Sequence, residues 1–266
     1  QITKSPDRLL IAELTTSFLE KSGLLRNGAT MQAGAGGTSL AIAVYVHQLL
    51  KKKGWKLSFG FGGSTKYMVD MLEEGQMGYI LDAQAFDLDS VKSIEKNLNH
   101  IPYPVFNAYN YHSKGNLTTM MDIMILGATE IDTGFNGNVV THSDGLLLHG
   151  IGGWQNCLHA RNVIIPVPLF RDRIPVIVDR VTTLCGPGEL IDVIITERGI
   201  AINPRRQDLI DSVRGKGLPL VTIEELKDIA EKMCGKPEKA AFDDRVVAAI
   251  KWVDGTVIDA VRKVKR

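Results

Sequence analysis

Cysteine is scarce in this chain of 266 residues, which has only Cys157, Cys185 and Cys234. These residues lie far apart, so no two have the spacing of a zinc site, and an odd number argues against a disulfide framework. Reduced thiols are usual in the cytosol, where disulfides are rare. The sequence therefore predicts a cytoplasmic protein with neither a disulfide framework nor a metal site.

Strong charge and long hydrophobic runs are also lacking. The 31 Lys and Arg nearly balance the 30 Asp and Glu, and a net charge of +1 gives no electrostatic attraction for nucleic acid or an anionic membrane. No apolar run approaches the ~20 residues of a bilayer span, and we recognise no signal peptide. We expect no nucleic-acid or membrane partner. Because the first residue is Gln1 rather than Met, we also expect a piece of a longer chain.

What the sequence does contain is a repeated unit of strand, glycine-containing loop and helix. Alternation of this kind predicts a parallel sheet covered by helices. The expected strands are mostly apolar, as strands buried on both faces of a parallel sheet are. Strands are expected at 29–34, 55–61 and 77–84, and helices at 40–53, 66–75 and 87–98.

The rest of the chain extends this pattern less regularly. Ser5-Pro6-Asp7 has the residues of a helix start, and 101–116 is a long irregular connection of a kind that is often functional. Buried strands are expected at 122–131 and 161–168, and two more around the Gly-Pro-Gly turn within 173–196. We predict one α/β domain over 1–266, with a mostly parallel sheet, flanking helices and a helical tail from about 206 to 266.

Three glycine-rich loops, 34–37, 62–65 and 150–153, follow or precede expected strands. Glycine lets backbone N–H groups approach a ligand closely, and at the start of a helix such groups suit a phosphate, a carboxylate or a developing oxyanion. Ligand crevices of α/β sheets lie at the carboxyl ends of strands, so the loops could meet in one cleft. The alternative is that the glycines only make tight turns. The candidate binding residues are Gly34, Gly36, Gly37, Gly62, Gly63, Ser64, Gly150, Gly152 and Gly153.

Several familiar sites are excluded by spacing. The first loop is no dinucleotide fingerprint, because Ser39 stands where the third glycine belongs and 56–61 carries no acid. A Walker lysine and a G-x-S-x-G elbow are both missing from the sequence. The histidines are scattered without metal spacing, and packing is the favoured role of Cys157. The histidines weighed are His112, His142, His149 and His159.

Polar side chains near these loops are further candidates. Glu130 and Asp132 alternate with Ile131 at a strand end, and as a pair they could polarise a ligand or anchor the glycine loop. For Asp132 we favour a cap of the turn 132–138, in which Asn138 is a further candidate. Gln155 and Asn156 follow the third loop and could orient a substrate.

The chain contains LGATEIDTGFNGNV at 126–139 followed by GIGGWQN at 150–156, with AGAGGTS at 33–39 and an expected strand at 190–204. Together these stretches resemble the CoA-transferase superfamily. Within it, the stretches 31–50, 78–91 and 186–206 most closely resemble the carboxyl-terminal half of the citrate lyase alpha chain family. The resemblance implies a CoA-transferase-like (NagB/RpiA-like) fold.

The resemblance also implies an activity: exchange of acetyl for citryl on a thioester, with citrate as acceptor. The prosthetic group would be phosphopantetheine-like and carried by an acyl carrier (gamma) subunit, beside a lyase (beta) subunit and the chain's own amino-terminal half. Residues 58–64 lack the nucleophilic Glu of ordinary family members, so a mixed-anhydride route is implied. The candidate catalytic residues are Glu130, Gly152 and Gly153.

Citrate also needs a cation, for which Arg161, Arg171 and Arg173 are candidates. Two other functions remain open at this point. One is a scaffold that docks the lyase subunits without catalysis. The other is a sugar-phosphate isomerase, which is supported by analogy of fold alone.

Overall fold

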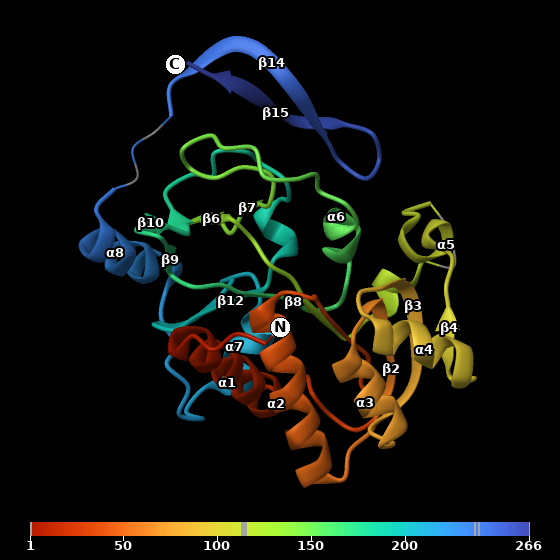
Figure 1. Cartoon of the computed structure of the whole chain (residues 1–266). Helices are drawn as coiled ribbons and strands as arrows, with labels where there is room; N and C mark the ends of the chain where they lie inside the picture. The colour runs from red at the N-terminus through yellow and green to blue at the C-terminus, as the bar shows by residue number, and fades with distance from the viewer. Residues whose placement is uncertain (1, 113–115, 237, 239, 266) are drawn as a thin grey trace.

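An eight-stranded sheet forms the centre of the computed structural model, which describes residues 2–112, 116–236, 238 and 240–265 (Figure 1). Its strands are β1 (Met31–Ala33), β2 (Leu57–Ser64), β3 (Met77–Ala85), β4 (His100–Pro102), β5 (Ile123–Ile125), β8 (Val163–Pro166), β12 (Val193–Thr196) and β13 (Gly199–Ile202). They lie in the order β13-β12-β8-β5-β1-β2-β3-β4. Only the β12–β13 pair is antiparallel. The expected α/β class with a mostly parallel sheet is confirmed.

Helices cover one side of this sheet, below it in Figure 1. They are α1 (Pro6–Lys21), α2 (Gly37–Lys53), α3 (Lys66–Glu73), α4 (Leu88–Lys96) and α7 (Gln207–Val213). The apolar face of α2 buries Ile42, Val46 and Leu50 in the core that contains the strands. This helix ends where Gly54 adopts φ +65°, a left-handed conformation that glycine tolerates without strain. The repeated strand–helix pattern therefore produces the layer that was expected from it.

A second layer lies above the large sheet in Figure 1. A three-stranded sheet, in the order β11-β6-β7, forms its centre, and its core contains Phe135, Trp154 and Leu158. The strand expected at 122–131 is broken here, because the chain leaves the large sheet after β5 and enters the small one at β6. The elements of this layer and its margins are α5 (Val105–Tyr109), η1 (Leu117–Met120), β6 (Glu130–Asp132), β7 (Gly137–Asn138), α6 (Trp154–Cys157), β9 (Phe170–Arg171), β10 (Ile174–Pro175), β11 (Ile177–Val178), η2 (Gly188–Leu190) and α8 (Ile223–Cys234).

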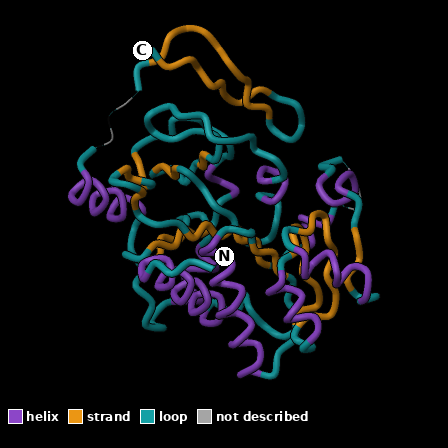
Figure 2. Tube along the Cα trace, in the orientation of Figure 1, coloured by secondary structure: helices purple, strands orange, loops and turns teal. Residues whose placement is uncertain are grey.

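The helical tail expected over about 206–266 is wrong in its last part. Helices α7 and α8 are present, but β14 (Phe242–Lys251) and β15 (Val257–Val264) form an antiparallel hairpin, drawn at the top of Figure 2. Its turn contains Asp254-Gly255, with Gly255 at φ +94°, and Asp-Gly is a strong hairpin signal. β-branched residues crowd a helix but pack well on a pleated surface, and both strands are rich in valine.

Candidate functional site

The first and third glycine loops lie at the same edge of the large sheet. β1 and β5 are parallel neighbours, so their carboxyl ends lie side by side. The first loop continues from β1. The third loop is held over the end of β5, because the indole Nε1 of Trp154 donates to the carbonyl of Gly127 at 2.8 Å. The fold therefore brings together two loops that are more than a hundred residues apart in sequence.

Backbone N–H groups of the first loop are free to bind a ligand. From Gly34 to Ser39, none of them donates a hydrogen bond to another described residue, and Leu40 is the first donor, to the carbonyl of Gly36 at 2.9 Å. No atom lies within 4 Å of the position of a Cβ on Gly36. These groups form the start of α2, where the helix dipole favours negative charge. The first loop is therefore suited to an anion or an oxyanion.

The third loop has the same property. Gly150, Ile151, Gly152 and Gly153 donate no backbone hydrogen bond to the described residues. Gly152 has φ +59°, and open space surrounds the Cβ positions of Gly150 and Gly152. A cavity of about 300 Å³ lies beside this loop, lined by Gly127, Ala128, Thr129, Val139, His149, Ile151, Trp154 and Arg171. The loop thus presents free donors next to a space that a small molecule can enter.

Of the three candidate arginines, the structure places Arg171 in this cavity. Its Nη2 donates to the carbonyl of Ala128 at 2.7 Å, which fixes the guanidinium there. Burial and the positive charge of Arg8 lower the pKa of Arg171, so a bound anion would relieve an unfavourable environment. Arg161 instead pairs with Asp122 at 2.9 Å and is largely exposed. Arg171 is therefore the candidate cation for a carboxylate.

The second glycine segment is not an open loop. Gly62, Gly63 and Ser64 belong to β2 and pair with β3. A Cβ on Gly63 would lie 1.8 Å from a ring carbon of Phe86, so the ring occupies the space above this glycine. The hydroxyl of Ser64 is buried and donates to Asp82 at 2.8 Å. Strand pairing and close packing account for Gly63 and Ser64, and none of the three residues is presented as the other two loops are.

Asp82 forms the centre of a buried polar cluster behind Gly63. Its Oδ2 meets Nε2 of His100 at 3.2 Å as well as the Ser64 hydroxyl, and its Oδ1 accepts from the N–H of Gln84 at 2.7 Å. Burial opposes ionisation of Asp82, but the hydrogen bonds from His100, Ser64 and Gln84 outweigh it and lower the pKa. The cluster joins the ends of β2, β3 and β4.

Glu130 is fully engaged by protein donors. Its carboxylate accepts from Asn138 Nδ2 at 2.7 Å, from the Thr182 N–H at 2.8 Å and hydroxyl at 3.0 Å, and from the Ser143 hydroxyl. It lines a separate cavity of about 90 Å³, which contains no residue of the glycine loops. Asn138 is completely buried in the same network. The hydrogen bonds of Glu130 therefore hold the segments around Asn138, Ser143 and Thr182, and none of them joins it to a described residue of a glycine loop.

Asp132, Gln155 and Asn156 also make structural contacts. Asp132 accepts from the N–H groups of Gly134 at 2.9 Å and Asn136 at 3.0 Å, which confirms the predicted turn cap. Nε2 of Gln155 donates to the carbonyl of Cys185 at 2.8 Å, and Nδ2 of Asn156 donates to the carbonyl of Tyr109. The two amides thus hold α6, and with it the third loop, in place.

Cys157 is buried beside these amides, as the packing interpretation requires. Burial raises the pKa of its thiol to about 12, which disfavours the thiolate that a nucleophile needs. No group of three or more His, Cys, Asp and Glu with the arrangement of a metal site occurs among the described residues. None of the described helices is long and apolar enough to cross a membrane.

Two residues beside the glycine segments escaped the sequence analysis, Gln32 and Tyr109. The ring of Tyr109 lies against Gly153 and 5.4 Å from that of Phe61 between centroids, and its hydroxyl reaches Gly62. Gln32 is the polar residue between Met31 and Ala33 in β1, directly before the first loop. A polar side chain in so short and buried a strand was the available signal. Tyr109 belongs to the irregular stretch 101–116, of which 113–115 lie outside the described residues.

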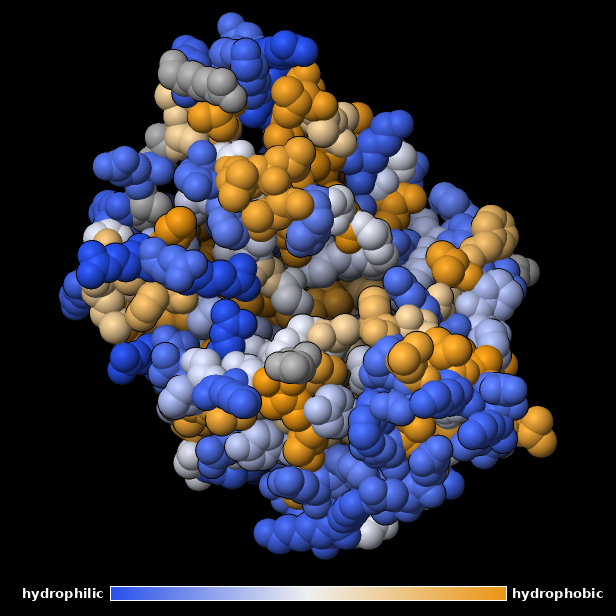
Figure 3. Space-filling view, in the orientation of Figure 1, coloured by the Kyte–Doolittle hydropathy of each residue, from blue (hydrophilic) through white to orange (hydrophobic). Residues whose placement is uncertain are grey.

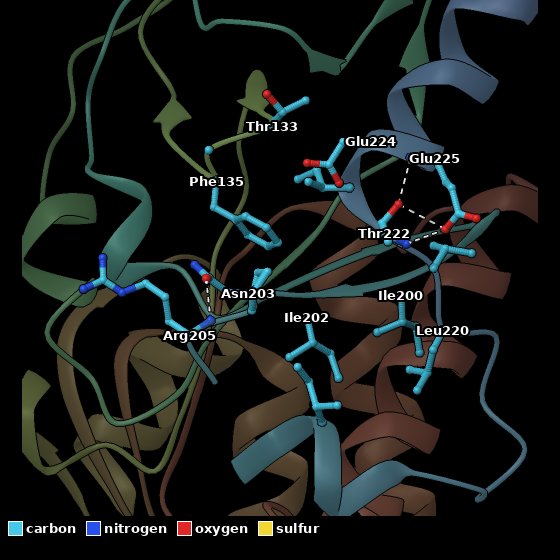
Figure 4. Close-up of a pocket in the computed structure, with 15 residues that line it drawn as sticks. Thr133, Phe135, Ile200, Ile202, Asn203, Arg205, Leu220, Thr222, Glu224 and Glu225 are labelled. Carbon is cyan, nitrogen blue, oxygen red and sulfur yellow. Dashed lines mark hydrogen bonds between the residues drawn. The ribbon is translucent and has the colours of Figure 1, made fainter. Parts of the chain in front are cut away.

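A larger apolar groove, of about 570 Å³, lies at another part of the molecule (Figure 4). Figure 4 shows Ile200, Ile202 and Leu220 along it. Its dashed lines mark the capping contacts between Thr222 and Glu225 at the start of α8 and the hydrogen bond from the Arg205 N–H to Asn203. No residue of the glycine loops lines this groove, and its lining is mostly apolar. Size alone does not make it the candidate site, because the acyl transfer that the sequence resemblance implies would need donors for developing charge. On the face in Figure 3, a recess separates the upper from the lower part of the molecule.

Comparison with known proteins gives one consistent family. A family model described as citrate lyase, alpha subunit (CitF) matches residues 1–264. The citrate lyase alpha chains of Klebsiella pneumoniae and Escherichia coli (strain K12) are 42% and 39% identical to the whole chain, which covers 52% of each. The chain therefore spans about half the length of these curated relatives.

Solved structures agree with this comparison. A structure from Streptococcus mutans, described as the alpha subunit of citrate lyase in complex with citrate, matches with a TM-score of 0.97 and 40% identity. The match covers 100% of this chain and 52% of that one. RipA from Yersinia pestis matches with a TM-score of 0.57 at 14% identity, over 88% of this chain and 53% of that one, and shows the fold alone.

Proposed function

Because the chain belongs to the citrate lyase alpha subunit family, we propose that it forms half of a citrate CoA-transferase site. In this proposal it exchanges acetyl for citryl on a thioester. The thiol belongs to a phosphopantetheine-like group on an acyl carrier subunit, or to CoA itself. The rest of the alpha chain, the carrier and a lyase subunit are the partners, in a cytoplasmic complex. The Streptococcus mutans relative, whose structure contains citrate, supports citrate as the acceptor.

The observation that carries this proposal is the pair of free-amide loops at one sheet edge, 34–39 and 150–153. Attack on a thioester carbonyl places negative charge on its oxygen, and fixed N–H groups stabilise that charge without having to reorganise. A scaffold has no need of such groups. The open Cβ positions of Gly36 and Gly152 leave room for an acyl group against the backbone.

The reaction we propose needs no carboxylate nucleophile from the chain. A carboxylate oxygen of citrate attacks the acetyl carbonyl carbon, the C–S bond breaks, and a citric–acetic anhydride and a free thiolate result. The thiolate then attacks the citryl carbonyl carbon of the anhydride, and acetate leaves. Both steps pass through an anionic tetrahedral intermediate. Residues 58–64 carry no acid, and Glu130 is occupied by four donor groups, which supports this route.

The remaining carboxylates of citrate need a cation, and Arg171 lines the cavity beside the third loop. A guanidinium suits this role because its planar N–H groups match the geometry of a carboxylate. In the proposal Arg171 holds citrate, while the loop amides stabilise the reacting carbonyl. Gln155 and Asn156 act indirectly, through the position of α6.

The test is Gly152→Val in the full-length protein that carries this sequence, with citrate-dependent release of acetate from acetyl-CoA as the assay. Valine keeps the backbone N–H, but its side chain fills the open space and is strained at φ +59°, which moves this donor away from the acyl oxygen. Loss of an oxyanion donor typically lowers turnover ~10²–10³-fold, and we expect a loss of about 10²-fold. Gly217→Val is the matched control, since Gly217 has φ +67° and equally open surroundings in a distant turn. We expect the control to retain turnover within about twofold, because the backbone strain is similar and only the place differs.

Two results would contradict the proposal. A folded Gly152→Val protein with normal turnover would favour a scaffold. Turnover by the unmodified protein without any thioester would favour isomerase chemistry. Mass spectrometry after incubation with acetyl-CoA examines the route separately, since a stable acyl or CoA adduct on the chain is incompatible with direct attack by citrate.

A further inference from the structure

The carboxamide oxygen of Gln32 is buried without a hydrogen-bond partner among the described residues. The residue is 8% exposed, and its Oε1 has no partner among the described residues. Buried polar side chains are nearly always hydrogen-bonded, because an unmade bond costs the desolvation of the group. Gln32 lies at the carboxyl end of β1, directly before the first loop. An unused acceptor at this place points to a ligand that donates to it.

The hydroxyl of Tyr109 is the second unused polar group. It makes no hydrogen bond to the described residues, although the ring packs between Phe61 and Gly153. Burial, together with the nearby Cys157 and Asp82, raises the pKa of Tyr109. The group therefore keeps its proton at neutral pH and is available as a donor.

The side chains of Gln32 and Tyr109 converge on Gly62. A Cβ placed there would lie 3.1 Å from Cγ of Gln32, 3.7 Å from its Nε2 and 3.5 Å from the Tyr109 hydroxyl. Gly62 also has φ +101°, which other residues rarely adopt. A side chain at this position would crowd the space between the two polar groups. The glycine therefore keeps this space free of a side chain of the protein.

We propose that Gln32 and Tyr109 form a recognition pair for a hydroxyl group on the substrate. A hydroxyl both donates and accepts, so it can donate to Oε1 of Gln32 and accept from Tyr109. A carboxylate only accepts, and would leave Oε1 unpartnered. This inference rests on the proposed function and deepens it. Citrate carries such a hydroxyl, and so does the pantothenate portion of a CoA-type thioester.

The first arm of the test compares citrate with tricarballylate, which has the same three carboxylates and no hydroxyl. Dissociation constants are measured by calorimetry on the full-length protein. We expect citrate to bind about tenfold more tightly, as a hydrogen bond of this kind contributes. Gln32→Leu and Tyr109→Phe should each weaken citrate toward the value for tricarballylate and leave tricarballylate within about twofold.

The second arm compares acetyl-CoA with S-acetyl-N-acetylcysteamine, a thioester without the pantothenate hydroxyl. If Gln32→Leu lowers kcat/KM about tenfold for acetyl-CoA alone, the hydroxyl belongs to the carrier group rather than to citrate. Either selective loss supports the pair. Two ratios decide the outcome: the dissociation constant of tricarballylate over that of citrate, and kcat/KM for acetyl-CoA over that for S-acetyl-N-acetylcysteamine. If neither ratio changes in either variant, the pair is refuted, while turnover by the unmodified protein still supports the proposed function.

Matched controls separate recognition from folding. Gln207→Leu and Tyr111→Phe make the same chemical changes on α7 and at a half-exposed tyrosine. They should leave both ratios unchanged. Because the Gln32 carboxamide makes no hydrogen bond within the described protein, leucine should leave the melting temperature unchanged or raise it. A purely structural glutamine would instead lower the melting temperature without a change in ligand preference.

Discussion

Gly63→Ala tests whether that glycine serves packing or substrate binding. The added methyl would lie 1.8, 2.6 and 2.8 Å from three ring carbons of Phe86. Ordinary carbon–carbon contact needs ~3.5 Å, so the nearest atoms must separate by about 1.7 Å. Overpacking of a core typically costs ~1–3 kcal/mol. Phe86 is 49% exposed and can move outward, which favours the lower end, about 1 kcal/mol.

A double-mutant cycle with Phe86→Ala measures this contact directly. Without the ring, Gly63→Ala should be neutral or slightly stabilising, since alanine lowers the entropy of the unfolded chain. The coupling free energy is then about 1 kcal/mol. Urea unfolding followed by circular dichroism gives the four values, and the matching shift in Tm is about 2–4 °C for 1 kcal/mol in a chain of this length.

Two outcomes would refute this reasoning. One is an equal loss of stability from Gly63→Ala with and without Phe86. The other is a loss of transferase activity at unchanged stability, which would return Gly63 to the substrate site. Gly127→Ala is the control for stability, because no atom lies within 4 Å of its Cβ position and its φ is not positive.

Two further predictions concern buried carboxylates. Because the folded pKa of Asp82 is lowered, its ionised form stabilises the fold above the unfolded pKa of ~3.9 and this contribution is lost as the pH falls through the folded value. Asp82→Asn should therefore flatten the decline of Tm with acid below about pH 4, and an unchanged slope would contradict the prediction. Glu130→Gln should lower the free energy of unfolding by ~1–3 kcal/mol, because an amide NH₂ then faces the donors of Asn138, Ser143 and Thr182. Urea unfolding identical to that of the unmodified protein would remove the anchoring role.

Local sequence patterns predicted the strands and helices of the first hundred residues well. Apolar strands that alternate with amphipathic helices leave few arrangements other than a covered parallel sheet. The same reasoning failed near the carboxyl end, where 246–264 has both helical spacing and β-branched residues. Asp254-Gly255 was the local evidence for a hairpin, and contacts of the hairpin with the body of the protein decide the matter. Leu184 N–H donates to Asp259 at 2.7 Å, and Val261 is buried in the core.

The three glycine segments show what a sequence motif can predict and what it cannot. The sequence predicted a loop at each of the three. Residues 62–64 instead continue β2, because β3 pairs with them and Phe86 covers Gly63. Partners of this kind come from elsewhere in the chain and leave no trace in the motif. The same holds for Glu130, whose donors Ser143 and Thr182 are remote in sequence.

By itself, the sequence determined the α/β class, the glycine loops at strand ends and the likeness to the citrate lyase alpha subunit family, because periodicity and motifs are local properties of the chain. Only the tertiary structure decided which backbone donors remain free and which polar groups share one space. Gln32, Gly62, Tyr109 and Gly153 meet because β1 and β2 are neighbours and α5 folds over their ends. Hydrogen-bond partners and buried space arise from chain crossings, and those depend on the whole fold.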